Sequence, residues 1–196
     1  MVAMYRSAET DSVHTANLRI YPREAHGPVA GVIVRIARTK EAMLNVSYDI
    51  RARLECIRVP AQAPVRIAQH LWQHTCCELF MRAEGAAGYH ELNFSPSGEW
   101  AAYALEGYRE GRMLADESLD PRIRRCQGVG MIELSATIDL ARLSASYPGA
   151  PLALGVAAVI EARDGSCSHW ALAHPAEKPD FHHPDAFLVK LDAIRH

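Results

Sequence analysis

A carboxyl group inside an apolar segment is the first feature of this sequence that could do chemistry. Glu78 lies in residues 76–81, which read Cys-Cys-Glu-Leu-Phe-Met. Burying a carboxylate costs free energy unless a partner replaces the lost water, so Glu78 needs such a partner. Either it accepts hydrogen bonds from the hydroxyl groups of a bound ligand, or it forms a structural ion pair with an arginine such as Arg109. The residue alone leaves both interpretations open.

A polar face is expected on the following segment, residues 89–95. Successive side chains of a β-strand point to opposite faces, so residues at every second position share a face. Here one face carries four polar side chains: Tyr89, Glu91, Asn93 and Ser95. This face either lines a binding surface or is simply exposed to solvent.

Histidine and cysteine side chains also suggest metal binding. They gather in two parts of the chain: His70, His74, Cys76 and Cys77, and later His174, His182 and His183. Zinc accepts both ligand types. However, the spacing contains neither a C-x-x-C pair nor an H-E-x-x-H motif. We therefore expect a site without a cofactor, with a haem or a divalent metal held by Met81 or the histidines as the alternative.

The motifs of nucleophilic catalysis are missing from the sequence. It contains no G-x-S-x-G or S-x-x-K motif and no glycine-rich phosphate loop. Cys76 and Cys77 follow His74 closely, but neighbours along a strand point to opposite faces, so this closeness does not indicate a catalytic pair. The sequence favours a binding protein over an enzyme and leaves enzymatic activity open.

The elements that must position these residues are mostly strands. Residues 43–50 alternate most clearly, with apolar side chains at every second position. Ten further segments have a strand-like pattern: 17–21, 29–38, 54–59, 76–82, 89–95, 100–108, 130–138, 152–161, 168–173 and 187–191. Turn residues separate them at 84–88, 95–98 and 163–165. About ten short strands at this spacing predict an all-β, antiparallel β-sandwich.

The remaining segments predict loops within one domain. Residues 115–127 are polar. Residues 175–185 contain three prolines and should form an ordered irregular loop across the surface, which either has a structural role or folds over the ligand face. One helical turn is possible at 139–144. No linker divides the chain, so we expect a single domain over residues 1–196 with a core at about 15–192.

Composition and net charge limit the classes of binding partner that we expect. The chain has 196 residues and a formal net charge of −2, with its positive charges scattered. Nucleic acids and anionic membranes require a basic face, so neither is an expected partner. Five cysteines do not form a regular disulfide framework, and no apolar run suggests a signal peptide or a membrane span. We therefore expect a cytoplasmic protein.

Two stretches resemble a known family. Trp72 precedes Glu78 by six positions, Leu79 and Phe80 follow, and the next strand pattern ends at a Ser-Pro-Ser-Gly turn, residues 95–98. Residues 168–172, Ser-His-Trp-Ala-Leu, resemble a strand that carries a second tryptophan. Together these stretches resemble the DOMON-like superfamily, in the branch that is similar to carbohydrate-binding module family 9 and includes uncharacterised bacterial DOMON-like proteins.

This resemblance implies a β-sandwich whose relatives bind sugars or haem. In the sugar-binding relatives two tryptophans sandwich a sugar ring, and Trp72, Glu78 and Trp170 match those positions, with Asn93 and His174 as further hydrogen-bonding partners. A flat aromatic side chain suits the apolar C–H face of a sugar. We therefore expect recognition of a carbohydrate or a similar small polar ligand. The alternatives are a haem- or metal-binding protein of this fold and a protein–protein interaction subunit, and the oligomeric state stays open.

Overall fold

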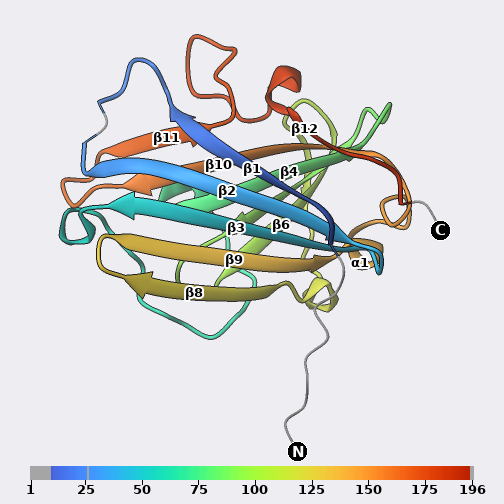
Figure 1. The fold of residues 1–196 in the computed structure, drawn as a ribbon, viewed down its shortest axis with the longest axis horizontal. Coiled ribbons are helices and arrows are strands. Elements are labelled where there is room, and N and C mark those ends of the chain that lie inside the picture. Colours follow the sequence, from blue (N-terminus) through green and yellow to red (C-terminus); the bar gives the residue numbers. More distant parts are fainter. Residues whose placement is uncertain (1–9, 26, 195–196) are drawn as a thin grey trace, which may run out of the picture.

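Two antiparallel layers of β-strands face each other in the computed structural model, which describes residues 10–25 and 27–194 (Figure 1). Layer A lies in front in this view. Its strands, in spatial order, are β8 (Arg122–Gly128), β9 (Met131–Asp139), β3 (Met43–Ala52), β2 (Val29–Thr39) and β1 (Thr10–Ile20).

Layer B lies behind layer A and carries the residues of functional interest. Its strands, in spatial order, are β7 (Glu110–Met113), β6 (Trp100–Gly107), β5 (Tyr89–Phe94), β4 (Cys76–Ala83), β10 (Leu152–Glu161) and β11 (Cys167–Ala171), and β12 (Val189–Leu191) also pairs with β10. β1 pairs with β11 through Arg19–Ala171 and Ile20–Trp170, so both layers belong to one hydrogen-bonded path.

Helical structure is confined to short turns within the described residues. One α-helical turn, α1 (Leu140–Leu143), occurs where the sequence allows one. The 3-10 helices are Leu54–Cys56, Leu71–Gln73, Glu117–Leu119 and Pro184–Ala186. No helix in the described part of the chain has the length and apolar character needed to cross a bilayer.

The core lies between the layers and is formed by the apolar side chains at every second position of the strands. In β3 the inward side chains Leu44, Val46, Tyr48 and Ile50 are almost fully buried. Burying each such side chain contributes about 2 kcal/mol. Tyr48 also donates a hydrogen bond of 2.7 Å to the backbone carbonyl of Glu78, which ties layer A to β4. Trp100 belongs to this core as well.

Layer B is buried on both faces along its central strands. Every residue of β10 is buried, which explains its nearly continuous apolar sequence. One face meets the core, and the other is partly covered by residues 172–188, here called the cover segment. A Cβ atom at Gly155 would lie 3.3 Å from the carbonyl oxygen of Ala186, so small residues on β10 allow this close packing.

The expected β-sandwich is confirmed, and most predicted strands are found with small shifts at their ends. The first strand, predicted at 17–21, begins earlier, at Thr10, and ends at Ile20. Two segment predictions are wrong. Residues 54–59 form a 3-10 turn and an isolated bridge between Ile57 and Ala162 rather than a strand. Residues 115–127, expected to be a loop, contain most of β8. Of the strands that the structure describes, β8 pairs only with β9, and its mostly polar side chains hide the alternation of inward and outward positions.

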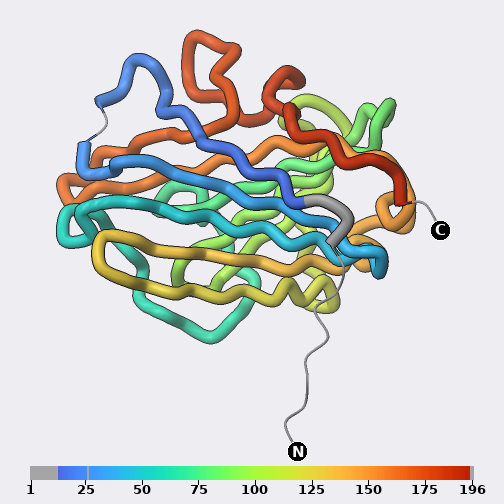
Figure 2. Tube along the Cα trace, in the orientation of Figure 1, coloured from blue at the N-terminus to red at the C-terminus, as the bar shows by residue number. Residues whose placement is uncertain are grey.

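The predicted turns are present. In residues 95–98 the N–H of Gly98 donates to the carbonyl of Ser95 at 2.9 Å, and the φ of +97° at Gly98 favours glycine. The cover segment, which includes the predicted loop 175–185, is irregular apart from its 3-10 turn. In Figure 2 it is the orange-to-red trace beside the blue β1–β2 connection, and the Tyr21 hydroxyl donates to the carbonyl of Glu177 there.

Candidate ligand-binding site

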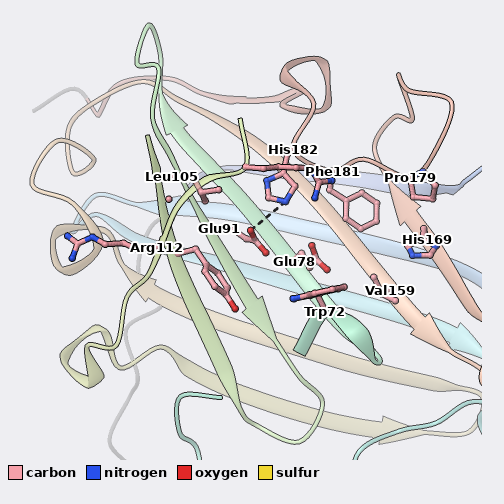
Figure 3. Close-up of a pocket in the computed structure, with 13 residues that line it drawn as sticks. Trp72, Glu78, Glu91, Leu105, Arg112, Val159, His169, Pro179, Phe181 and His182 are labelled. Carbon is pink, nitrogen blue, oxygen red and sulfur yellow. Dashed lines mark ion pairs between the residues drawn. The ribbon is translucent and has the colours of Figure 1, made fainter. Parts of the chain in front are cut away.

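A cavity of about 440 Å³ lies on the outer face of layer B, beneath the cover segment (Figure 3). It draws residues from β4, β5, β6, β7, β10, β11, the cover segment and the turn before β4. The lining residues are Trp72, Glu78, Glu91, Tyr103, Leu105, Arg109, Gly111, Arg112, Val159, His169, Pro179, Phe181 and His182.

Trp72 supplies a large flat apolar surface to this cavity. It lies in the 3-10 turn Leu71–Gln73, directly before β4. The turn begins after His70, whose left-handed backbone (φ +59°) redirects the chain. Trp72 remains 49% exposed, which is unusual for so large an apolar side chain. In Figure 3 its indole is seen edge-on near Glu78. It is therefore available for contact with a ligand.

Glu78 is the most deeply buried acid of the site. Its residue exposure is 3%, although the side chain lines the cavity. No group in residues 10–25 or 27–194 forms a hydrogen bond or ion pair with its carboxyl group. Burial, and then repulsion from Glu91, raises the pKa of Glu78 well above its ordinary value. Of the two interpretations left open for Glu78, the ion pair with Arg109 is not formed in the described structure, where the Arg109 guanidinium pairs with Asp180 at 2.9 Å.

Glu91 lies on the neighbouring strand and is also buried. Asn93 donates a hydrogen bond of 2.8 Å from its side-chain amide to Glu91 Oε1. His182 Nε2 lies 3.7 Å from Glu91 Oε2, the contact dashed in Figure 3. Burial raises the pKa of Glu91, and the Asn93 hydrogen bond opposes the increase. Two acidic side chains with raised pKa values thus share one cavity, a common property of binding and catalytic sites.

His182 is a neutral group in this cavity at pH 7. Burial, and then the charge of Arg109, lowers its pKa to about 4. Its contact with Glu91 is therefore not an ion pair at neutral pH. The ring Nδ1 lies 2.8 Å from the Tyr89 hydroxyl, and this oxygen accepts the backbone N–H of Arg109 at 3.2 Å. If the Tyr89 O–H donates to Nδ1, the Nε2 proton of His182 points toward Glu91.

Asp180 anchors the cover segment over the cavity. Its two carboxylate oxygens accept hydrogen bonds from Tyr108 at 2.7 Å and from Arg109 at 2.9 Å. Burial would raise the pKa of Asp180, but these hydrogen bonds outweigh it, and the net pKa is lowered. Tyr108 and Arg109 form the turn between β6 and β7, so this contact joins the hairpin to the cover segment.

The structure brings Trp72 and Glu78 to the cavity but not the other predicted site residues. Asn93 is fully buried behind Glu91, and its Oδ1 has no partner within the described chain. His174 lies against Phe181 with a ring-centroid separation of 6.4 Å, and its Nε2 lies 2.8 Å from the Arg19 carbonyl. Both residues thus support lining residues without lining the cavity themselves.

Trp170 does not form a pair with Trp72, and that expectation is wrong. The strand register explains the error: Glu78 lies opposite Ala157, which lies opposite Ala171. Trp170 is one position away, so its side chain points to the other face. It is 2% exposed and packs in the core between the layers.

Among the lining residues that were not predicted as ligand-binding residues, four have aromatic rings: Tyr103, His169, Phe181 and His182, the last considered only as an alternative metal ligand. They come from β6, β11 and the cover segment, which are distant from Trp72 along the chain. For Tyr103 and His169 a signal was present, since strand alternation places each on the face opposite to a neighbouring core residue. The proline-rich loop of Phe181 and His182 had suggested a cover, but not which side chains would turn inward.

Comparisons with known proteins give structural matches alone. No protein-family model matches the sequence, and no curated protein matches it. A crystal structure of a protein from Bacteroides uniformis, to which carbohydrate binding has been ascribed, has a TM-score of 0.65 at 17% identity, covering 89% of this chain and 84% of that chain. The two chains share a fold.

A carbohydrate-binding module of family 9 from Caldicellulosiruptor kristjanssonii is similar at a lower level. Its complex with glucose has a TM-score of 0.48 at 12% identity, covering 86% of this chain and 81% of that chain. Its complex with cellotriose has the same TM-score and identity, covering 90% and 83%. The resemblance of the sequence to the DOMON-like superfamily stays a prediction.

Proposed function

We propose that this protein binds a carbohydrate, without cleaving it, in the cavity beneath the cover segment. The observation that carries the proposal is the exposed face of Trp72 in the same cavity as the buried carboxyl groups of Glu78 and Glu91. A sugar has apolar C–H faces and a polar hydroxyl rim, and this arrangement offers a surface for each. Carbohydrate binding ascribed to the Bacteroides protein of the same fold agrees with the proposal.

The size of the cavity supports a small ligand. Small-molecule sites commonly occupy about 300–1,000 Å³, and 440 Å³ lies near the lower end of that range. One indole face covers on the order of 100 Å² of a sugar, which contributes about 2.5 kcal/mol. Association itself costs more free energy than this stacking contributes. Binding therefore also depends on hydrogen bonds between the sugar hydroxyl groups and the acids of the cavity, and we expect a weak dissociation constant, about millimolar to micromolar.

The test is isothermal titration calorimetry of the protein with a panel of monosaccharides and short oligosaccharides. Trp72→Ala should weaken binding of the best sugar roughly tenfold or more, because the stacking surface is lost. Val129→Ala is the control, since this residue is fully exposed and outside the cavity. Binding of no sugar by the wild-type protein, or equal binding by Trp72→Ala, would contradict the proposal.

A further inference from the structure

The floor of the cavity holds two carboxyl groups and one polar partner for them. On the outer face of layer B, Glu78 lies opposite Asn93, and Glu91 is two positions from Asn93 on the same strand. Such diagonal neighbours on one face have Cα atoms roughly 7–8 Å apart. Asn93 donates to Glu91, and Glu78 has no partner in the described part of the chain, although it is 97% buried.

The basic groups of the cavity are already engaged or point elsewhere. Arg109 pairs with Asp180 at 2.9 Å, and His169 Nδ1 lies 2.7 Å from Glu24. Figure 3 shows the guanidinium group of Arg112 directed away from Glu78. Arg109 is close enough to lower the pKa of both acids, but it does not reach either carboxyl group.

The other titratable groups around Glu78 supply no positive charge at neutral pH. His182 is a neutral ring bound to the Tyr89 hydroxyl. Tyr103 lines the cavity, and burial raises its pKa, so it stays protonated. Cys76, on the same strand and face as Glu78, is likewise a protonated thiol because burial raises its pKa well above the ordinary value. Within the described part of the chain, therefore, no cationic group contacts the carboxyl group of Glu78.

Aromatic side chains form the walls above these acids. Trp72, Tyr103 and Phe181 all line the cavity. The face of an aromatic ring attracts a cation, and a carboxylate beside such rings adds an opposite charge. Aromatic walls with an acidic floor are thus suited to an ammonium group. A neutral hydroxyl group would use the same walls but would leave the acids without a counter-charge.

We propose that the ligand presents a protonated amine to Glu78 and Glu91, so that an amino sugar is bound in preference to its neutral parent sugar. The sugar part of this inference rests on the proposed function, and the amine part rests on the two acids. The ammonium group donates to Glu78 and Glu91, and any proton that a carboxyl group carries before binding passes to the buffer. Hydrogen bonds between charged groups are about twice as strong as neutral ones.

The test is calorimetry at about pH 7 with EDTA present, where most of an amine is protonated. The probes are D-glucosamine, D-glucose, N-acetyl-D-glucosamine, which keeps the nitrogen but loses its charge, and cyclohexylamine, which keeps the amine but lacks hydroxyl groups. D-glucosamine should bind about tenfold more tightly than D-glucose or the acetylated sugar. Repeating the titration in buffers of different ionisation enthalpy should show proton release with D-glucosamine alone among the three sugars.

Two substitutions distinguish the effect of the charge at Glu78 from an effect on folding. Glu78→Gln keeps the shape of the side chain and should lower the D-glucosamine to D-glucose affinity ratio several-fold, because one of the two acids at the ammonium group is lost. Glu106→Gln removes an exposed carboxylate on β6 outside the cavity and should leave the ratio unchanged. Unfolding curves of both variants verify that each is folded.

The possible failures are distinguishable. Equal affinities for D-glucosamine and D-glucose would overturn the amine inference and leave carbohydrate binding intact. Tight binding of cyclohexylamine with no binding of D-glucose would support the amine and overturn the proposed function. Displacement of D-glucosamine by calcium chloride, with EDTA omitted, would overturn the inference, because the two acids would then form a metal site.

Discussion

Glu78 shows how one residue can be unfavourable for folding and useful for binding. Its carboxyl group is buried beside that of Glu91, and no group of the described chain hydrogen-bonds to it. Natural proteins retain such residues mainly at functional sites, where stability is lower than the fold allows. The same argument predicts that the free protein gains stability when this acid becomes neutral.

Glu78→Gln should therefore raise the Tm of the free protein, and by more as the pH rises. The pKa of Glu78 in the folded state lies well above 4.5, so the folded protein binds this proton more tightly than the unfolded chain. Stability is then lost as the pH increases from 4.5 through the folded-state pKa. The gain from the substitution should be small near pH 4.5 and reach on the order of 2 kcal/mol above that pKa. Melting curves across this range measure it.

The wild-type profile alone would be ambiguous, which is why the difference between two proteins is needed. The pKa of His182 is lowered to about 4, so this group destabilises the fold as the pH falls below its ordinary value of 6.5. That contribution is common to both proteins and cancels in the difference. Glu106→Gln should follow the wild-type profile, and a lower Tm for Glu78→Gln at every pH would contradict the prediction.

Some of the individual site residues could be predicted from the sequence. Glu78 was found because an acid within an apolar segment is unusual, and Trp72 because its spacing to Glu78 resembles that of the DOMON-like superfamily. Trp170 was misassigned because the pairing of β11 with β10 determines which side chains share the face of Glu78. A shift of one position reverses the face, and a single sequence does not contain the register.

The hairpin of β6 and β7 is the element on which the cavity depends most. β7 has four residues, includes the lining residue Gly111, and pairs with β6 alone among the described strands. Its turn holds the cover segment through the contacts of Tyr108 and Arg109 with Asp180. A disturbance of this hairpin should therefore alter the cavity and its cover together.

Gly111→Ala tests that dependence. An added Cβ atom would overlap the carbonyl oxygen of Ala104 and lie 2.6 Å from the Cα atom of Leu105, so β7 must move away from β6. We expect a loss of about 2 kcal/mol in the free energy of unfolding, measured in urea, together with weaker sugar binding. Gly128→Ala is the matched control, because no atom lies within 4 Å of its added Cβ. An unchanged stability of Gly111→Ala would show that the hairpin adapts.

Elements with two distinct faces were predictable, and the two edge strands were not. β3 and β9 alternate between core and solvent, so their sequences contain the period of a strand. β7 and β8 lie at the ends of the hydrogen-bonded path, with mostly polar sequences. Their strand structure comes from pairing with β6 and β9, which is a tertiary effect and leaves little trace in the local sequence.

The whole molecule has an edge at each end of its strand path, at β7 and at β8. β8 carries the exposed residues Arg122 and Arg124, and its half-buried Arg125 donates to the backbone carbonyls of Pro60 and Pro96. Charged side chains on an edge strand prevent pairing with a second molecule. We therefore expect Arg122 and Arg124 to protect this edge from pairing with a second molecule.

Replacing Arg122 and Arg124 by valine should make the folded protein associate through β8. The free energy of unfolding should change by about 0.5 kcal/mol or less, because both side chains are exposed. Light scattering should nevertheless show growth of large species with time and concentration. The double substitution by lysine keeps the charges and should stay dispersed. If the valine protein remains dispersed as well, the arginines do not protect this edge.

The three tryptophans lie in such different environments that their fluorescence reports on different parts of the molecule. Trp72 is 49% exposed at the cavity, whereas Trp100 and Trp170 are 3% and 2% exposed in the core. An aqueous quencher added to the folded protein reaches the first indole and leaves the other two bright. The long-wavelength part of the emission therefore reports on occupancy of the cavity, while the short-wavelength part reports on the integrity of the β-sandwich, in one spectrum and without an added label.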